Sequence, residues 1–306
     1  MSEELAIETH QLRKEFGSKV AVQNLSLTVR RGEVFGFLGP NGAGKTTVVK
    51  ILLGLAAPTS GHAKLLGTPL GDRAARAKTG FLPEHFRFPE WLTGEEFLRF
   101  NGRLFGIPAQ QLQGRILRLL ELVGLTDYGK QKLQTYSKGM LQRIGLAQAL
   151  INEPELVFLD EPTSGLDPVG RLLVRDIIRD LSAKGKTVFL NSHLLSEVEI
   201  TCDRVAFIKH GQVIQTSPLK DLMLEGTRLE IRGDGLSADI VSGLASFGRD
   251  IHADGSKVRI TVSEKDGIAE ITCYLVQKEV NVYAMNTAVP SLEDLFLSII
   301  GTDGGL

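Results

Sequence analysis

The sequence predicts an α/β protein followed by a smaller α+β domain, and two patterns carry the α/β part. A short apolar run, Val34 to Leu38, leads into a glycine-rich loop and then into a stretch of helical periodicity, Lys45 to Leu55. Further along, two apolar runs, Leu156 to Leu159 and Thr187 to Leu190, flank a helical stretch, Gly170 to Ala183. Strand, helix and strand at that spacing indicate a parallel crossover unit.

The segments around this core add a β part and a helical part. Ile7 to Leu12 and Val20 to Val29 are rich in β-forming residues and are interrupted at Gly17, so we expect two strands before the core. From Thr93 to Ile151 apolar residues recur three and four apart, so this segment should be mostly helical.

The pattern changes after Pro218, which is the third observation behind the predicted fold class. Just before it, two short β-rich runs predict a hairpin, Val205 to Lys209 and Gln212 to Thr216. Beyond it, three stretches indicate strands: RLEIRG, KVRITV and VNVYAMN. Three others indicate helices: DIVSGLASFG, AEITCYLVQKE and SLEDLFLSIIG. We place a boundary near Leu222 to Gly226, giving a large domain, 1–222, and a small α+β domain, 223–306.

Composition restricts the class of protein and its location. The 306 residues are 42% hydrophobic and 23% charged, as in ordinary globular proteins. A net charge of −1 gives no basic excess, so we expect no nucleic-acid partner. Cys202 and Cys273 lie far apart, which suits a reduced cytoplasmic compartment. The start, MSEELAIETH, is no signal peptide, and no apolar run reaches the roughly 18 residues of a membrane helix. Any role at a membrane therefore needs a partner.

The glycine-rich loop has the complete P-loop pattern, Gly39-x-x-x-x-Gly44-Lys45-Thr46. Glycines let backbone N–H groups converge on an anion at a helix N-terminus, where the helix dipole adds positive potential. Lys45 suits the β- and γ-phosphates of a nucleotide, and the Thr46 hydroxyl suits Mg²⁺. The alternative is an ordinary glycine-rich turn. The candidate phosphate-binding residues are Gly39, Pro40, Asn41, Gly42, Ala43, Gly44, Lys45, Thr46 and Thr47.

Two adjacent carboxylates end the apolar run at Leu156 to Leu159. Asp160 stands where a P-loop fold holds its second contact to Mg²⁺. Glu161 follows directly and could act as a general base on a water beside the γ-phosphate. The plainer interpretations are a strand-end cap for Asp160 and a solvated loop acid for Glu161.

In this order, the motifs GPNGAGKTT, YSKGMLQR, LVFLDEPTSGLDP and NSHLLSEVE resemble the ATP-binding subunits of ABC transporters, over Ile7 to Pro218. The resemblance implies a P-loop NTPase core with an antiparallel β subdomain and a helical subdomain. It also implies ATP hydrolysis, with Mg²⁺, coupled to transport.

The same resemblance implies roles for five further residues. Phe16 would stack on adenine, although a packed strand-end Phe is the alternative. Ser137 and Gly139 would contact the γ-phosphate held by a second copy, although Ser137 also suits a helix N-cap. Asp167 matches an aspartate that reaches across the dimer. His193 matches a switch histidine at the γ-phosphate, directly after a predicted strand end.

The sequence departs from the family pattern at three positions. Glu84 replaces the usual glutamine and joins Thr46 and Asp160 as a candidate contact of Mg²⁺, with added negative charge. Lys138 and Met140 replace a glycine and a glutamine in YSKGM. Together with the SLEDLF element, these forms resemble the exporter branch that includes drug, sodium and bacitracin efflux ATPases.

The predicted protein is a cytoplasmic ATPase, peripheral on the cell membrane, that forms an ATP-dependent homodimer on an integral membrane permease. Glu161, His193 and Lys45 are the expected catalytic residues. One alternative is a soluble ABC ATPase acting on ribosomes or DNA; a single P-loop and no coiled-coil insertion argue against it. Another is a regulatory module without turnover, which the presence of Glu161 and His193 disfavours. The transported substrate and the role of residues 223–306 stay open.

Overall fold

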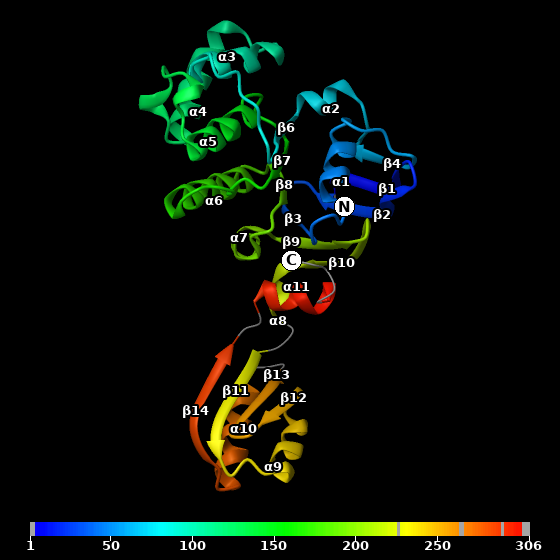
Figure 1. The fold of residues 1–306 in the computed structure, drawn as a ribbon, viewed down its shortest axis with the longest axis vertical. Coiled ribbons are helices and arrows are strands. Elements are labelled where there is room, and N and C mark those ends of the chain that lie inside the picture. The colour runs from blue at the N-terminus through cyan, green and yellow to red at the C-terminus, as the bar shows by residue number, and fades with distance from the viewer. Residues whose placement is uncertain (1–3, 225–226, 263–265, 289–290, 302–306) are drawn as a thin grey trace. The chain divides into compact units, whose positions relative to one another are not determined.

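The computed structural model describes residues 4–224, 227–262, 266–288 and 291–301. These residues form two units (Figure 1), one ending at Ser217 and including Ile300, the other running from Pro218 to Ile299. We had expected a boundary at 222–226; residues 225 and 226 of that range lie outside the described residues.

The centre of the first unit is a six-stranded sheet of order β10-β9-β3-β8-β7-β6. Within this order, the five strands β9, β3, β8, β7 and β6 are parallel to one another. The inner strands are continuous apolar runs, as expected where helices cover both faces. Its strands are β3 (Val34–Leu38), β6 (Thr79–Leu82), β7 (Leu156–Asp160), β8 (Thr187–Asn191), β9 (Arg204–Lys209) and β10 (Gln212–Pro218).

Three helices follow strands of this sheet. They are α1 (Lys45–Leu52) after β3, α6 (Pro168–Ala183) between β7 and β8, and α7 (Leu195–Thr201) after β8. Asp167 caps α6 by accepting from the Gly170 N–H at 2.8 Å, and Pro168 fits the first helical position. The predicted crossover from β7 through α6 to β8 is confirmed, because β7 and β8 pair in parallel.

An antiparallel sheet of order β2-β1-β4-β5 lies beside the core. Its buried face shares one apolar cluster with the parallel sheet, in which Leu25 and Val29 join Phe35 and Phe189. The elements here are β1 (Leu5–Phe16), β2 (Lys19–Arg30), β4 (Ser60–Leu65), β5 (Thr68–Pro69) and the short α2 (Arg73–Ala77). The two predicted strands are thus longer than expected, and β4 was not predicted.

The helical part consists of α3 (Gly94–Leu104), α4 (Ala109–Leu122) and α5 (Lys138–Ala149), with 3-10 turns at Thr126–Tyr128 and Leu133–Thr135. Figure 1 shows these helices grouped together, with α5 leading back to β7. A capping box starts α3: Thr93 Oγ1 accepts from the Glu96 N–H at 3.2 Å, and the Glu96 carboxylate accepts from the Thr93 N–H at 2.8 Å.

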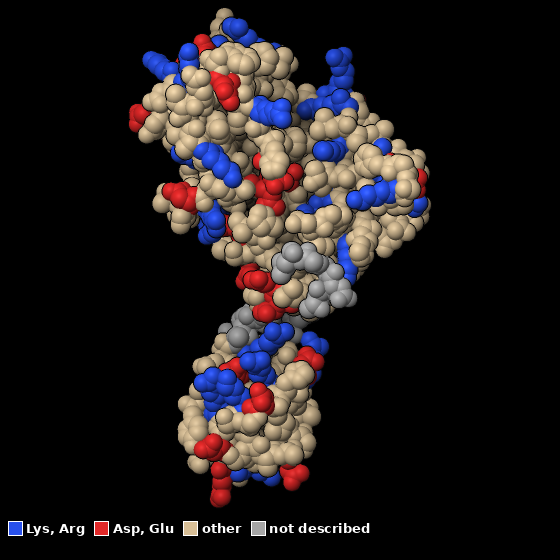
Figure 2. All heavy atoms as spheres, in the orientation of Figure 1, with Lys and Arg blue, Asp and Glu red and all other residues tan. Residues whose placement is uncertain are grey.

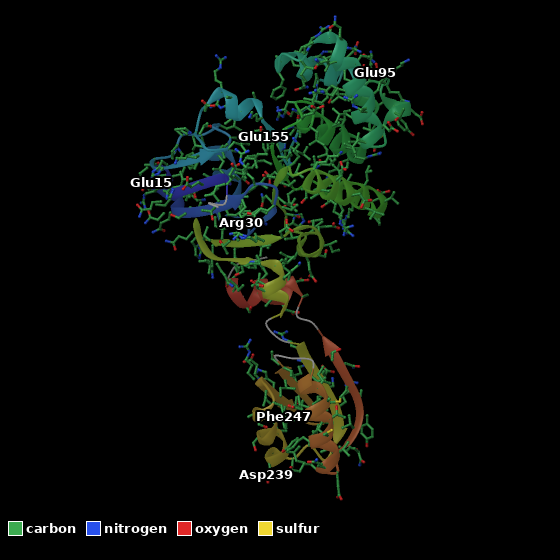
Figure 3. The ribbon with its side chains drawn as sticks, turned by 180° about the vertical axis from the view of Figure 1, so that it is seen from behind. Glu15, Arg30, Glu95, Glu155, Asp239 and Phe247 are labelled. Carbon is green, nitrogen blue, oxygen red and sulfur yellow. The ribbon has the colours of Figure 1, made fainter. Side chains whose placement is uncertain are left out.

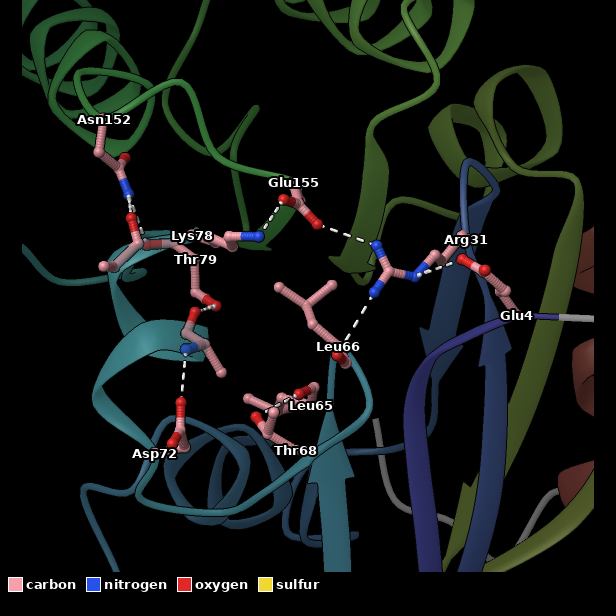
Figure 4. Close-up of polar contacts among 12 residues, drawn as sticks. Glu4, Arg31, Leu65, Leu66, Thr68, Asp72, Lys78, Thr79, Asn152 and Glu155 are labelled. Atoms are coloured by element: carbon pink, nitrogen blue, oxygen red, sulfur yellow. Dashed lines mark hydrogen bonds and ion pairs between the residues drawn. The ribbon is translucent and has the colours of Figure 1, made fainter.

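An ion-pair cluster fixes the amino end of the parallel sheet (Figure 4). Glu155, just before β7, lies 2.7 Å from Lys78 Nζ and 2.9 Å from Arg31 Nη1. Arg31 also donates to the Leu66 carbonyl at 3.3 Å, which ties the antiparallel sheet to the core. Hydrogen bonds from Lys78 and Arg31 lower the pKa of Glu155 below its ordinary 4.5.

The second unit is a four-stranded antiparallel sheet of order β12-β13-β11-β14 with helices between strands, a split β-α-β arrangement. Its interior includes Leu229, Ile231 and Ile260, and Phe247, labelled in Figure 3, lies 5.4 Å from the Tyr274 ring. Its elements are α8 (Leu219–Leu224), β11 (Thr227–Asp234), α9 (Ala238–Gly243), a 3-10 turn (Leu244–Ser246), β12 (Arg249–Asp254), β13 (Lys257–Val262), α10 (Asp266–Gln277), β14 (Asn281–Ala288) and α11 (Leu292–Ile300).

The predicted fold class, with its α/β core, antiparallel part, helical part and C-terminal α+β part, is confirmed. Within the described ranges no helix has the length and apolar character to cross a bilayer. On the face of the first unit that Figure 2 shows, acidic and basic side chains are interspersed.

Candidate functional site

The loop between β3 and α1 has the backbone shape that an anion nest requires. Gly42 and Gly44 have φ of +80° and +102°, values that side-chain-bearing residues rarely adopt. Gly44 is the N-cap of α1 and offers no side chain there, so the backbone itself forms the helix entrance. Lys45 Nζ donates to the carbonyl oxygens of Gly39 at 2.6 Å and Pro40 at 3.2 Å. Its ammonium group thus lies directly over the loop.

The loop is held by the turn between β9 and β10. The Gly211 N–H donates to the Ala43 carbonyl at 2.9 Å, and the Gly211 carbonyl accepts from the Gln23 N–H of β2 at 2.8 Å. This link sets the β1–β2 hairpin against the phosphate loop. Phe16 ends β1 with 55% of its surface exposed, so it is not a packed strand-end residue. Lys14 Nζ lies 4.8 Å from its ring centroid, and stacking on adenine stays a prediction.

The carboxyl ends of β3, β8 and β7 meet at this edge, as in other open parallel sheets that bind ligands there. Asp160 is the last residue of β7 and only 4% exposed. Its neighbour in register is Asn191, the last residue of β8, whose Nδ2 donates to Asp160 Oδ1 at 2.5 Å. This bond fixes one carboxylate oxygen and leaves the other for a ligand.

Glu161 and His193 face each other across the same edge. His193 Nδ1 lies 2.7 Å from Glu161 Oε2, and the His193 N–H donates to Glu161 Oε1 at 2.9 Å. Glu161 has φ of +52°, a strained conformation for a non-glycine residue and one that often occurs at functional sites. The Glu161 side chain is 9% exposed and that of His193 is 61% exposed. A buried carboxylate therefore meets an imidazole that solvent and ligands can reach.

The charges of the site are coupled. Burial lowers the pKa of Lys45 below 10.5, and three carboxylates oppose that shift, in decreasing order Glu161, Asp160 and Glu84. Burial raises the pKa of Asp160 above 3.8, against the hydrogen bond from Asn191. Burial also raises the pKa of Glu161 above 4.5, against its contacts with His193. Lys45 and the predicted carboxylates therefore lie within electrostatic reach of one another.

The donor set suits Mg²⁺ bound together with a nucleotide. Mg²⁺ usually takes one or two carboxylates, with phosphates and waters completing its shell. Asp160 offers a fixed carboxylate, and Thr46 is an exposed residue in the first turn of α1. Glu84 follows β6 with its side chain 46% exposed, and its charge raises the pKa of Asp160. The described residues contain no cluster of three or more metal-binding side chains, so phosphate would have to supply part of the shell.

The other predicted residues lie at helix starts. Ser137 is the N-cap of α5, and its Oγ accepts from the Met140 N–H at 3.2 Å; it is exposed, and Gly139 is in the first turn. Asp167 caps α6. In the isolated chain the plainer role of Ser137, a helix cap, is therefore observed, and a contact with a second copy stays a proposal.

Two residues that support the site were not predicted. One is Asn191, which holds Asp160. The other is Gln142 of α5, whose Nε2 donates to the carbonyls of Glu161 at 3.1 Å and Pro162 at 3.2 Å. The signal for Asn191 was in the sequence, because LVFLD and TVFLN end in the same way with a polar residue.

Because of Glu161, the free energy of unfolding should decrease as the pH rises. Because its folded pKa is raised, its stabilising contribution is complete below about 4.5 and is lost as pH rises through the folded value. Glu161→Gln should therefore raise Tm at neutral pH, by an amount on the order of a few degrees, and the gain should shrink toward about pH 4. Thermal unfolding of the nucleotide-free protein over this range measures it.

Glu155→Gln is the matched control, because the pKa of Glu155 is lowered. Its contribution is present above its unfolded pKa and is lost as pH falls, so this substitution should lower Tm at neutral pH. Equal pH dependence of both variants would contradict the assignment of Glu161 as a carboxyl strained by burial.

Comparison with known proteins agrees with this geometry. Residues 22–164 match a family model described as "ABC transporter". An ABC transporter ATP-binding protein of Nostoc is 52% identical over 216 residues, which are 70% of this chain and 64% of that protein. A Nod factor export ATP-binding protein of Rhizobium is 36% identical, covering 98% of each chain. A linearmycin resistance ATP-binding protein of Bacillus subtilis is 32% identical, covering 96% of this chain and 98% of that one.

Among solved structures, an ATP-binding subunit of an ABC transporter superposes with a TM-score of 0.67 at 30% identity, over 71% of this chain and 91% of that one. The fold and the phosphate loop define a P-loop NTPase. The chain belongs to the ABC transporter ATP-binding proteins.

Proposed function

We propose that this chain hydrolyses ATP to power a separately encoded membrane permease, most simply an exporter. The observation that carries the proposal is the pair formed by buried Glu161 and exposed His193 at the same sheet edge as Lys45 and Asp160. A regulatory module that only binds nucleotide has no need for a buried, strained carboxylate at this edge.

In hydrolysis, five residues would have separate roles. Lys45 would exchange its bonds to the Gly39 and Pro40 carbonyls for bonds to phosphate oxygens. Glu161 would take a proton from the attacking water, and its raised pKa favours that transfer. His193 would donate to the γ-phosphate while its other side keeps Glu161 oriented. Mg²⁺, bound through Asp160 and Thr46, would neutralise phosphate charge.

Two copies would close on two ATP molecules. Ser137 and Gly139 lie at the exposed start of α5, where N–H groups favour an anion, and they would meet the γ-phosphate held by the other copy. Asp167 would contact the partner nearby. A closed state that requires ATP turns binding and hydrolysis into a cycle of closing and opening.

The permease would dock on the helical part. There, three large apolar side chains in α3 or in the segment before it are exposed: Trp91 at 72%, Phe100 at 55% and Leu104 at 69%. Phe100 and Leu104 are four residues apart, so they share one helix face. Apolar exposure of this kind marks an interaction surface. The names of the relatives, Nod factor export and linearmycin resistance, support the direction of transport.

The double substitution Phe100→Ser and Leu104→Ser should disconnect the ATPase from its permease. We expect at least about a tenfold loss of the integral membrane protein that co-purifies from detergent-solubilised membranes. A few large anchor side chains, buried once the partner is bound, supply most of the binding energy of an interface. ATP hydrolysis by the purified chain should stay unchanged. Leu117→Ser is the matched control, since Leu117 is 49% exposed on the neighbouring helix α4. Equal loss in the control, or retention in the double variant, would reject this docking face.

The same co-purification experiment distinguishes the proposed transport function from the alternative, a soluble ABC ATPase acting on ribosomes or DNA. A soluble ABC ATPase would co-purify with ribosomal or DNA-bound proteins and would show no integral membrane partner. The interspersed charge on the face in Figure 2 offers no support for a nucleic-acid partner there.

A further inference from the structure

We infer that Arg175 and Glu197 form a positioning pair that holds His193 against Glu161. The inference rests on the proposed function, because it concerns the reactivity of the same site. Arg175 lies on α6 and Glu197 on α7. Arg175 Nε and Nη2 donate to the Glu197 carboxylate through three contacts of 3.1–3.2 Å. The two side chains are 22% and 10% exposed, so this forked ion pair is largely shielded from water.

The pair matters because α7 cannot fix its own start. The helix has seven residues, and its N-cap, Leu194, provides no side-chain cap. Helices this short are marginal unless tertiary contacts hold them. Glu197 is in the first turn, and His193 lies just before that turn. Val198 anchors the other side of α7 in the core. His193 and Leu194 are held by hydrogen bonds to Glu161 and Ser192, and Arg175 adds the contact from α6 that holds the first turn of α7 behind them.

The same pair borders the loop that carries Glu161. A cavity of about 10 Å³ is lined by Thr163, Arg175, Ser192 and Glu197 among others. That is room for about one water molecule. The Thr163 hydroxyl is buried and has no hydrogen-bond partner within the described part of the chain. Residues 163 and 192 adjoin the loop of Glu161 and that of His193, so the pair packs behind both reacting segments.

Removing Arg175 should loosen this arrangement without touching the nucleotide. Arg175→Met keeps much of the apolar stem but leaves the Glu197 carboxylate buried without a counter-charge, which is strongly unfavourable. The first turn of α7 must shift so that Glu197 reaches solvent, and His193 shifts with it. A displacement of about 1 Å in a reacting group can cost about 10²-fold in rate. We expect turnover to fall about 10- to 100-fold, with ATP affinity retained within about twofold.

A double-mutant cycle with His193→Ala separates positioning from general stability. If Arg175 acts through His193, Arg175→Met should change single-turnover hydrolysis by less than about twofold in the His193→Ala background. The control is Arg204→Met, which breaks an ion pair of similar burial, Arg204 to Glu33 at 2.8 Å. That pair lies near Arg30, labelled in Figure 3, at the opposite edge of the sheet. Its effect on turnover should be small and independent of His193.

Arg175→Lys keeps the charge and loses the fork, so it should recover part of the lost turnover; it also serves if Arg175→Met does not fold. The inference is overturned if Arg175→Met and His193→Ala act additively on turnover, or if Arg204→Met lowers turnover as much. These results would leave the proposed function intact. That function fails separately if the wild-type protein shows no ATP hydrolysis.

Discussion

Glu161→Gln is expected to stop ATP hydrolysis and to leave ATP binding intact. Glutamine keeps the shape of the side chain but cannot accept a proton from water, and a lost general base typically costs about 10²–10⁴-fold in rate. The His193 N–H can still donate to the remaining carbonyl oxygen, and the loop from Gly39 to Thr47 is unchanged. Steady-state turnover and nucleotide titration of the same preparation measure both quantities.

Asp160→Asn is the informative comparison, because it should weaken binding as well as chemistry. Asp160 is the fixed carboxylate proposed to hold Mg²⁺ and also accepts the bond from Asn191. If Glu161→Gln hydrolysed ATP at the normal rate, another residue would be the base. Glu84, the other carboxylate within electrostatic reach of Lys45, would then be the next candidate.

Lys45→Ala should weaken ATP binding and reduce turnover by about 10²–10³-fold or more, as for other preorganised charge contacts. Lys45 already lies over the loop carbonyls and is partly buried, so its charge is in place before the phosphate arrives. Lys50→Ala is the matched control, since Lys50 is an exposed lysine in the last turn of the same helix. Wild-type turnover in Lys45→Ala, or an equal loss in Lys50→Ala, would contradict the phosphate-loop assignment.

The core of the fold could be predicted because its strands are buried on both faces. Three strands, β3, β7 and β8, are buried along their whole length and consist mostly of apolar residues: VFGFL, LVFLD and TVFLN. Short, nearly continuous apolar runs of this kind are typical of the inner strands of a parallel sheet. The predicted ends of two helices differ from those in the structure. The helix predicted to reach Leu55 ends at Leu52, and Gly54 then adopts φ of +70°. The helix predicted over DIVSGLASFG gives way to a 3-10 turn after Gly243.

The strands β4 and β12 escaped prediction because tertiary pairing defines them. SGHAKL, the strand β4, contains a glycine and three polar residues, and it is a strand because it pairs with β1, for example His62 with His10. RDIHAD, the strand β12, is mostly exposed and is ordered by β13. The secondary structure of such segments depends more on pairing with a neighbouring strand than on the intrinsic β-propensity of their residues.

The residues of the candidate site also fall into two groups, those that a local sequence pattern identifies and those that only the fold brings together. Gly39 to Thr47, Asp160 and Glu161 could be identified from local pattern alone, because phosphate and metal chemistry require those residue types at that spacing. The contact of Gln142 with the Glu161 carbonyl depends on two segments meeting in space, which no local pattern contains. The same holds for the ion pair of Arg175 and Glu197, which are 22 residues apart in the sequence.

The central claim, that two copies close on ATP, is tested most directly by measuring the molar mass of Glu161→Gln in Mg²⁺-ATP by light scattering, together with the bound nucleotide. For Glu161→Gln we predict a molar mass twice that of one chain, with one ATP bound per chain. Adding Ser137→Arg to this variant should return it to single chains, because a bulky cation would replace the small residue that meets the partner's phosphate. The measurement is repeated with detergent-solubilised membranes, because the proposed permease would bring two copies together. Single chains holding ATP under both conditions, or dimers that persist with Ser137→Arg, would contradict the account.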